Sequence, residues 1–484
     1  MGRPRTVSTG RALALLAAGA AGVAGACLLS AHGVEPFATW LYTTAWYPLL
    51  LAVEGAVALR HGRFLLLGRP GAALSVLAWS VPGWMIFEIL NLRLENWYYV
   101  FVPEERAALW TGVIVSFATV VPACFLPAAL FHPRDGGDRV GGRSVPVGLL
   151  RAVRWTGAAF LVLPLLWPRW FFPLVWGALT LLPEPDTARR APERSLLVDV
   201  LSGRWRRIGS LLAGGAVAGF CWEALNAVAR AGWIYTVPGL EELKLFEMPL
   251  LGFLGFPPLA LTCFALYQWL VVRGWAVPTG VFPGSALEDS SSPVPPVPEP
   301  GEDRGEKRRT GASTFPGPGL AVATIGGVVL VVGTLIAMER ETISSRSPRL
   351  RDLPGVLPAD VESLAAWGVG SVFDLAEADP AELAGRIPGV GPEAARDWVG
   401  TARLVTTRGL GTRLARYLRR WGIRSPGDLA RADPGAVARC FAAVEEVEVR
   451  SAQVRVWWRG ARVDTGAGEE RDGERVRPTC EGTA

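Results

Sequence analysis

The chain has 484 residues, half of them hydrophobic, with a formal net charge of +5 and only two lysines. Its apolar residues gather in stretches of about twenty with few charges, the length that crosses a bilayer core of about 30 Å. The three histidines and six cysteines show no spacing typical of a metal site or a disulfide framework. The composition therefore predicts an integral membrane protein without a metal or cofactor, and it gives no broad basic field for nucleic acid.

Nine apolar segments are expected to cross the membrane. The first also has features of a signal peptide ending near Cys27, but the large apolar residue usual before such a cysteine is missing, so an uncleaved span is expected. The fifth and sixth are short, and they form either a tight hairpin around Pro168 or a re-entrant pair. The nine segments are Ala12–Ala31, Ala38–Leu59, Gly71–Leu92, Leu109–Phe131, Val153–Trp167, Phe171–Leu182, Ile208–Ala229, Leu245–Val272 and Leu320–Met338.

Arginines concentrate in alternate loops, after the second, fourth and sixth segments. Because basic residues are retained on the cytoplasmic side, the N-terminus is expected there, in a multi-pass protein of the cell membrane. The loops 93–108 and 230–244 are poor in basic residues and rich in Trp and Tyr, as expected at the outer interface. Nine crossings place the C-terminal region outside the cytoplasm, whereas a re-entrant fifth or sixth segment places it inside.

The membrane region contains an internal repeat. Phe87–Asn91 recurs 135 residues later as Trp222–Asn226. In the same way, Trp97-Tyr98-Tyr99 recurs as Trp233-Ile234-Tyr235. The match continues from Val102-Pro103 to Val237-Pro238. Each half is expected to contribute four spans in the same orientation, which makes the repeat parallel.

Each half carries a glutamate followed three residues later by an asparagine on the same helix face. A carboxylate at membrane depth is costly, so it faces the protein interior or a polar cavity and has a partner. Glu88 with Asn91, and Glu223 with Asn226, are therefore the candidate sites, either around a shared polar cavity or as a clamp that only fixes helix packing. The cavity is also expected to include the aromatic residues Trp97, Tyr99, Trp233 and Tyr235.

Glu247 breaks the symmetry of the repeat, because the aligned residue in the first half is Thr111. It is expected to open an apolar helix beside Met248 and Pro249. Glu247 is therefore a third catalytic candidate or a helix-start carboxylate that complements the helix dipole. Glu54 is another acid for which the second half offers no aligned partner.

The second repeat loosely resembles the membrane repeats of the carotenoid cyclase families. The resemblance rests on Trp222, Glu223, Asn226, Trp233, Tyr235, Pro238, Glu241 and Glu242. It departs from that pattern because no double phenylalanine follows the paired glutamates. The resemblance implies acid-catalysed rearrangement of an isoprenoid lipid, with a protonated carboxyl as the proton donor.

The C-terminal region contains a second repeat, with an offset of 54. Trp367-Gly368-Val369 recurs as Trp421-Gly422-Ile423, and an Ala-Asp-Pro sequence recurs at the same spacing. Ile387–Gly391 and Arg408–Gly411 each precede a helical pattern and resemble the hairpins of helix-hairpin-helix units. In such hairpins the glycines, corresponding to Gly389, Gly391, Gly409 and Gly411, let backbone amides approach a phosphate.

Seven arginines and no acidic residue lie between Trp398 and Gly427. Arg413, Arg416 and Arg420 share one helical face beside the second hairpin, as a surface that binds the DNA backbone requires. The same face is also suited to docking a protein partner. The sequence contains no nucleotide-binding loop and no nucleophile motif. We therefore expect a membrane scaffold that tethers a protein- or DNA-binding module. The alternative is a membrane enzyme that acts on an isoprenoid or carotenoid lipid.

The predicted fold class is all-α, with a polytopic membrane helix bundle and a small helix-hairpin-helix module. The segment between them is rich in Pro, Ser and charged residues and cannot bury a core. The expected domains are 1–135 and 148–273 for the membrane repeats, 274–319 for a disordered linker, 320–338 for the final span, 353–463 for the helix-hairpin-helix module and 464–484 for a disordered tail.

Overall fold

The computed structural model describes residues 7–133, 145–237, 243–280, 318–466, 476 and 478–480. The chain is mostly helical, as predicted, and it divides into two compact units. The membrane unit comprises 1–96, 110–230 and 237–341, and the C-terminal unit comprises 97–109, 231–236 and 342–484. Pro238, Glu241, Glu242, most of the expected linker and most of the expected tail lie outside the described residues.

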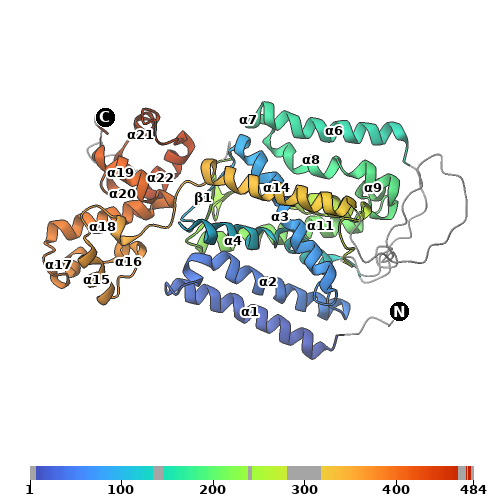
Figure 1. Ribbon diagram of the computed structural model, residues 1–484, viewed down its shortest axis with the longest axis horizontal. Helices are drawn as coiled ribbons and strands as arrows, with labels where there is room; N and C mark the ends of the chain where they lie inside the picture. The colour runs from blue at the N-terminus through green and yellow to red at the C-terminus, as the bar shows by residue number, and fades with distance from the viewer. Residues whose placement is uncertain are drawn as a thin grey trace, which may run out of the picture. The chain divides into compact units, whose positions relative to one another are not determined.

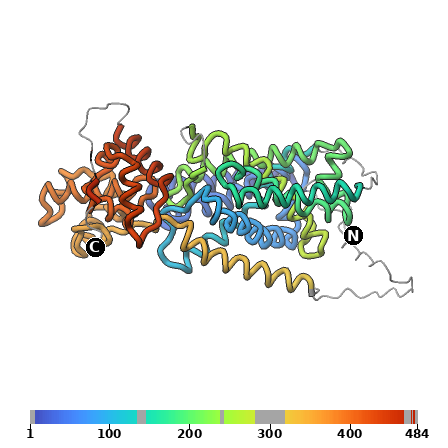
Figure 2. Tube along the Cα trace, turned by 90° about the horizontal axis from the view of Figure 1, so that it is seen from above, coloured from blue at the N-terminus to red at the C-terminus, as the bar shows by residue number. Residues whose placement is uncertain are grey.

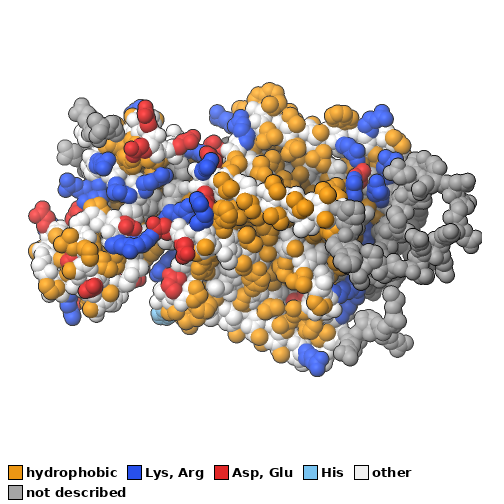
Figure 3. All heavy atoms as spheres, viewed as in Figure 1, with side chains coloured by type: hydrophobic (Ala, Val, Ile, Leu, Met, Phe, Trp, Pro, Cys, Tyr) orange, Lys and Arg blue, Asp and Glu red, His pale blue; other side chains and the backbone are white. Residues whose placement is uncertain are grey.

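Seven helices among the described residues are long and apolar enough to cross a membrane. Each coincides with one of the nine expected segments, so the prediction of membrane-length apolar helices is confirmed for these seven. Figure 3 shows that the visible face of the membrane unit is covered largely by hydrophobic side chains, as contact with lipid requires. The seven are Thr9–Ala31, Pro70–Leu94, Arg106–Phe131, Val147–Leu166, Trp205–Val228, Leu250–Val272 and Gly319–Glu341.

The second expected segment lies in α2 (Phe37–His61), which is long enough to cross a membrane but less apolar than the seven. It lies beside α1 (Thr9–Ala31), as Figure 1 shows. Glycines permit this close approach: a Cβ on Gly19 would lie 2.4 Å from the Ala52 nitrogen, and one on Gly55 would lie 2.6 Å from the Leu16 nitrogen. Small residues at such contacts are typical of helix pairs in membranes.

The sixth expected segment is broken into short helices. After α6 (Val147–Leu166) the chain forms α7 (Pro168–Phe171), η1 (Phe172–Leu174), α8 (Val175–Leu181) and α9 (Glu184–Arg190). Prolines in this stretch interrupt the helical hydrogen bonds. Asp186 of α9 pairs with Arg154 of α6 at 3.0 Å and with Arg273 at 2.5 Å, so the chain returns along α6 toward the end at which α6 begins. Both a hairpin and a re-entrant pair return in this way, so the two alternatives stay open.

The interior of the membrane unit is formed mainly by α5, α11 and α12, which pack on one another. The last helix, α14, packs on α3 and lies along the outside of the bundle, as Figure 2 shows. The remaining elements of the membrane unit are α3 (Pro70–Leu94), α4 (Arg106–Phe117), α5 (Val120–Phe131), η2 (Pro192–Arg194), α10 (Leu196–Leu201), α11 (Trp205–Val228), β3 (Lys244–Leu245), β4 (Met248–Pro249), η3 (Leu250–Gly255), α12 (Phe256–Val272) and α14 (Pro318–Glu341).

Glu54 and Glu184 are held in the same way within the membrane unit. Each is 2% exposed, and the carboxylate of each accepts hydrogen bonds from the backbone amides 12 and 13 residues further along the chain. The two carboxylates therefore have the same local role, which the sequence did not predict.

The C-terminal unit begins with a two-stranded antiparallel sheet of β1 (Trp97–Val100) and β2 (Gly232–Tyr235). These strands come from the loops that follow α3 and α11. Helices from residues 350–464 complete the unit. They are η4 (Leu350–Asp352), α15 (Pro358–Ala366), α16 (Val372–Glu377), α17 (Pro380–Arg386), α18 (Pro392–Thr406), η5 (Thr407–Gly409), α19 (Gly411–Arg420), α20 (Pro426–Arg431), α21 (Pro434–Ala442) and α22 (Ser451–Asp464).

The two halves of the helical part use the same local devices. Ser371 caps α16 by accepting a hydrogen bond from the Asp374 amide at 3.2 Å, and Ser425 caps α20 through the Asp428 amide at 3.2 Å. In return, the aspartate side chain accepts a hydrogen bond from the backbone amide of the capping serine, so each pair forms a capping box. The matching spacing supports the expected C-terminal repeat.

A disulfide joins Cys440 of α21 to Cys480, with the two Cα atoms 5.2 Å apart. The sequence shows no disulfide framework, and this single pair was not predicted from it. The two cysteines are separated by 40 residues, and a single pair at that distance forms no recognisable framework.

Candidate functional site

Glu88 of α3 and Glu223 of α11 are both fully buried, at 0% exposure. The Trp84 indole donates a hydrogen bond to Glu88 Oε1 at 2.8 Å. Asn91 is also buried, and its side-chain oxygen accepts the Asn96 amide at 2.9 Å, which ties down the chain after α3. Carboxylates placed this deeply require such partners.

Both glutamates adjoin one cluster of aromatic side chains. Trp84, which bonds Glu88, lies 5.5 Å from Trp222, measured between ring centroids, and Trp222 directly precedes Glu223. Trp222 also lies 5.8 Å from Trp46. The sequence analysis missed this cluster, because single aromatic residues in apolar helices carry no periodic signal. The cluster also includes Tyr42, Phe87, Phe117, Trp176 and Phe256.

The four aromatic residues expected in the polar cavity lie in one small sheet. Trp97 and Tyr99 are in β1, and Trp233 and Tyr235 are in β2, so all four belong to the C-terminal unit. Trp97 pairs with Tyr235 and Tyr99 pairs with Trp233 across the sheet. The pairing brings the four residues together, and a cavity that they share with the buried glutamates stays a prediction.

Glu247 does not open a helix, which corrects that expectation. It lies half-buried in the turn between β3 and β4, directly after Phe246, whose φ is +58°. Pro249 cannot donate a backbone hydrogen bond, and a 3-10 turn follows it, so α12 begins only at Phe256.

The hairpin at Gly389 and Gly391 is open. Gly389 has a φ of +79°, a conformation that favours glycine, and both glycines are exposed. A Cβ on either residue would meet no atom within 4 Å. Backbone amides at this position, where α18 begins, are accessible to a ligand.

The hairpin at Gly409 and Gly411 is covered by other parts of the C-terminal unit. Both glycines have a φ of +76°, and both are buried. A Cβ on Gly409 would lie 2.3 Å from the Val100 side chain, and one on Gly411 would lie 2.5 Å from Cβ of Ser345. The expected single surface of glycine amides and arginines is therefore wrong, because β1 and the segment after α14 occupy the glycine side.

The segment that covers this hairpin, 342–347, pairs with the end of β1 and the residues after it. The Tyr99 amide donates to the Thr342 oxygen at 2.8 Å, and the Ser344 amide donates to the Tyr99 oxygen at 2.9 Å. The Phe101 ring packs against Phe373 at 5.3 Å, which joins the sheet to the helices. This contact was not predictable from the sequence, since 342–347 has neither strand-like alternation nor a turn signal.

Arg413, Arg416 and Arg420 are exposed on α19. The Arg420 guanidinium lies 5.7 Å from the centroid of the Tyr417 ring, and Tyr417 donates a hydrogen bond to Glu446 at 3.0 Å. Partial removal from solvent raises the pKa of Tyr417 above its usual value, and the hydrogen bond to Glu446 raises it further. The cationic face expected from the sequence is therefore present, without the glycine amides.

Within the residues that the structure describes, no group of three His, Cys, Asp or Glu side chains is arranged to hold a metal ion. No curated protein and no solved structure matches the chain. Residues 347–404 match the family of SAM-like helix-hairpin-helix tandems, so the C-terminal unit contains a helix-hairpin-helix region of a kind that serves nucleic-acid or protein binding.

Proposed function

We propose that the chain is a multi-pass membrane scaffold that holds its helix-hairpin-helix module outside the cytoplasm and presents the arginine face of α19 to an acidic protein partner. The observation that carries the proposal is the burial of Gly409 and Gly411 against Val100 and Ser345. With this hairpin covered, the arginines lack the backbone amides with which a helix-hairpin-helix unit binds a phosphate. Exposed guanidinium groups remain available for carboxylates.

Connectivity supports the proposed sidedness. The C-terminal unit contains the loops after α3 and α11 and the segment after α14, so these three helix ends face one side of the membrane. The loops are poor in basic residues, whereas the loops at the opposite helix ends are rich in arginine. The disulfide between Cys440 and Cys480 is also typical of an oxidising compartment. The N-terminus is then cytoplasmic, and nine crossings account for the arrangement.

Two features support a parallel repeat in the membrane unit. In the sheet formed by β1 and β2, Tyr98 pairs with its repeat equivalent Ile234, and the neighbouring pairs Trp97–Tyr235 and Tyr99–Trp233 are equivalent to each other. Glu54 and Glu184 accept backbone amides at the same spacing. Two copies of one unit, related by an axis along the membrane normal, produce both features.

Charge reversal tests the proposed partner surface. The full chain, expressed in its own host, is cross-linked to its neighbours with and without Arg413→Glu, Arg416→Glu and Arg420→Glu combined. The exposed Arg439→Glu, on α21, is the matched control. We expect one cross-linked protein to be lost in the triple variant and kept in the control. Equal cross-linking in both variants, or salt-dependent binding of duplex DNA by the full chain through this face, contradicts the proposal.

The buried glutamates favour a second candidate, an enzyme that acts on an isoprenoid lipid. Glu88 and Glu223 adjoin an aromatic cluster, and aromatic faces stabilise positive charge such as a protonated intermediate carries. Lipid extracts from cells with the native chain, Glu88→Gln or Glu223→Gln test this candidate. A change in the isoprenoid profile that both variants abolish supports an enzyme, and identical profiles argue against it.

A further inference from the structure

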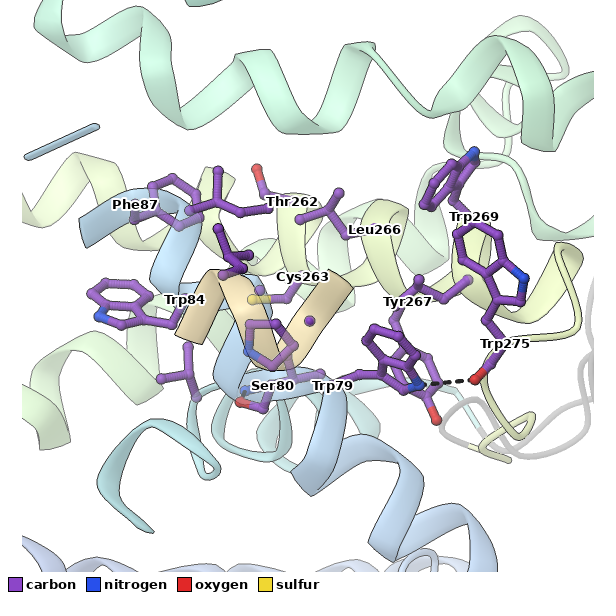
Figure 4. A pocket seen from close by; sticks show the side chains of 18 of the residues that line it. Trp79, Ser80, Trp84, Phe87, Thr262, Cys263, Leu266, Tyr267, Trp269 and Trp275 are labelled. Atoms are coloured by element: carbon purple, nitrogen blue, oxygen red, sulfur yellow. Dashed lines mark hydrogen bonds between the residues drawn. The ribbon is translucent and has the colours of Figure 1, made fainter. Parts of the chain in front are cut away.

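A cavity of about 220 Å³ lies within the membrane unit, between α3, α12 and α14. Figure 4 shows it from close by, with Trp84 and Phe87 near one end and Trp269 and Trp275 near the other. The cavity exceeds the roughly 150 Å³ of an engineered apolar cavity that takes up benzene, and it is smaller than the about 300 Å³ at which pockets for whole drug-sized ligands begin. Its size suits a segment of hydrocarbon chain.

The polar atoms around the cavity are already engaged with the protein. Ser80 donates to the Phe117 oxygen at 2.6 Å, and Thr262 donates to the Trp176 oxygen at 2.6 Å. The indole of Trp79 donates to the Trp275 oxygen at 2.8 Å. With these groups engaged, the wall offers mainly hydrocarbon and aromatic surface, so it selects an apolar chain over a headgroup.

One wall of the cavity is formed by small residues of a helix that is largely exposed. Ala323, Gly326 and Gly327 of α14 form that wall, and only 11% of the most apolar part of α14 is buried. A Cβ on Gly327 would lie 3.8 Å from Trp79, and one on Gly326 would meet nothing within 4 Å. The small residues leave room between α14 and α3 for a chain that enters from the side.

We propose that this cavity holds one acyl tail of a bilayer phospholipid, wedged between the final helix and the rest of the membrane unit. A site whose walls recognise only hydrocarbon is filled by the most abundant hydrocarbon around it, and in a membrane that is the phospholipid acyl chain. The bound tail fills space that protein side chains leave empty and supports the packing of α14 on α3.

Photo-labelling tests the proposal on the full chain in nanodiscs. The probe is a phospholipid with a photoactivatable group near the end of one acyl chain, and labelling of α3 between Trp79 and Phe87 is compared with labelling of α1. We expect α3 to be labelled well above its share of exposed surface. Gly327→Phe places a ring in the cavity and should reduce the labelling of α3 severalfold without changing that of α1.

Gly333→Phe is the matched control, because Gly333 lies on the same helix, is exposed, and a Cβ there would meet nothing within 4 Å. Gly326→Phe provides a second way to fill the cavity if Gly327→Phe fails to fold. Equal labelling of α3 in the Gly327→Phe, Gly326→Phe and Gly333→Phe proteins overturns the proposal. Labelling of the cavity by a photoactivatable polyprenyl lipid but not by the phospholipid also overturns it and favours the isoprenoid enzyme.

Discussion

The two halves of the C-terminal helical region have matching helices and caps but different surroundings. In the first half, Gly389 and Gly391 form an exposed hairpin. Where the first half meets the second, between α18 and α19, Gly409 and Gly411 form a hairpin that packs on Val100 and Ser345. The second half holds the disulfide. A hairpin sequence thus determines the local backbone, whereas the neighbours decide whether that backbone is a binding surface or a structural contact.

Loss of the disulfide should produce the largest difference in stability between the two halves. Cys480→Ser is expected to destabilise the second half by about 3–4 kcal/mol, because the cross-link closes a 40-residue loop and restricts the unfolded chain. Hydrogen exchange of the full chain in nanodiscs measures the effect in each half separately. Helices α19–α22 should open more often, while α16–α18 change less.

The same bond reports the location of the module. In cells that express the native chain, the exposed Cys480 should resist alkylation until a reductant is added, since an oxidising compartment preserves the disulfide. Alkylation of Cys480 in folded protein without a reductant would place the module in the cytoplasm and reduce the number of crossings.

Replacement of one glycine in each hairpin should have the next largest effect. Gly389→Ala and Gly409→Ala place a Cβ on backbone with nearly the same φ, +79° and +76°. The strained backbone costs about 1 kcal/mol in both proteins, and the clash with Val100 raises the cost at Gly409 to about 3 kcal/mol. Hydrogen exchange in α18 and α19 measures both. Equal destabilisation would mean that β1 does not cover the second hairpin.

These differences show what local sequence can and cannot reveal. The apolar runs and the glycine hairpins were predictable, because length and composition determine a membrane helix and a hairpin sets its own backbone. The pairing of β1 with β2 and with 342–347 was not, since it joins segments separated by more than a hundred residues that have little strand character. The cluster around Trp84 and Trp222 was missed for a related reason: it is assembled by packing of helices from both halves.

The caps should behave alike in the two halves. Ser371→Ala and Ser425→Ala each remove a side-chain oxygen that accepts a backbone amide at 3.2 Å. Each change is expected to cost about 1 kcal/mol, measured by hydrogen exchange in α16 and α20. A difference of more than about 1 kcal/mol would show that tertiary contacts, rather than the shared local motif, determine the stability of these helices.

The smallest expected effect concerns Tyr417, which stands 54 residues after Ser363 and gives the second half a contact that the first half lacks. Its hydroxyl donates to Glu446 on a partly exposed surface, so Tyr417→Phe is expected to cost about 0.5 kcal/mol near neutral pH. The pKa of Tyr417 is raised in the folded protein, so the contribution is present below the ordinary tyrosine pKa and is lost as the pH rises through the folded value.

The free energies of unfolding of the native chain and of Tyr417→Phe should therefore differ slightly at neutral pH and become equal in strong base. The hydrogen exchange of α19 at several pH values, corrected for the intrinsic exchange rate, measures this difference. Ser363→Ala in the first half is the matched control, because that hydroxyl donates only to the Ala359 oxygen of its own helix and does not titrate in this range. If the difference for Tyr417→Phe persists above the folded pKa, the ring packing beneath Arg420, and not the proton shared with Glu446, stabilises this part of the second half.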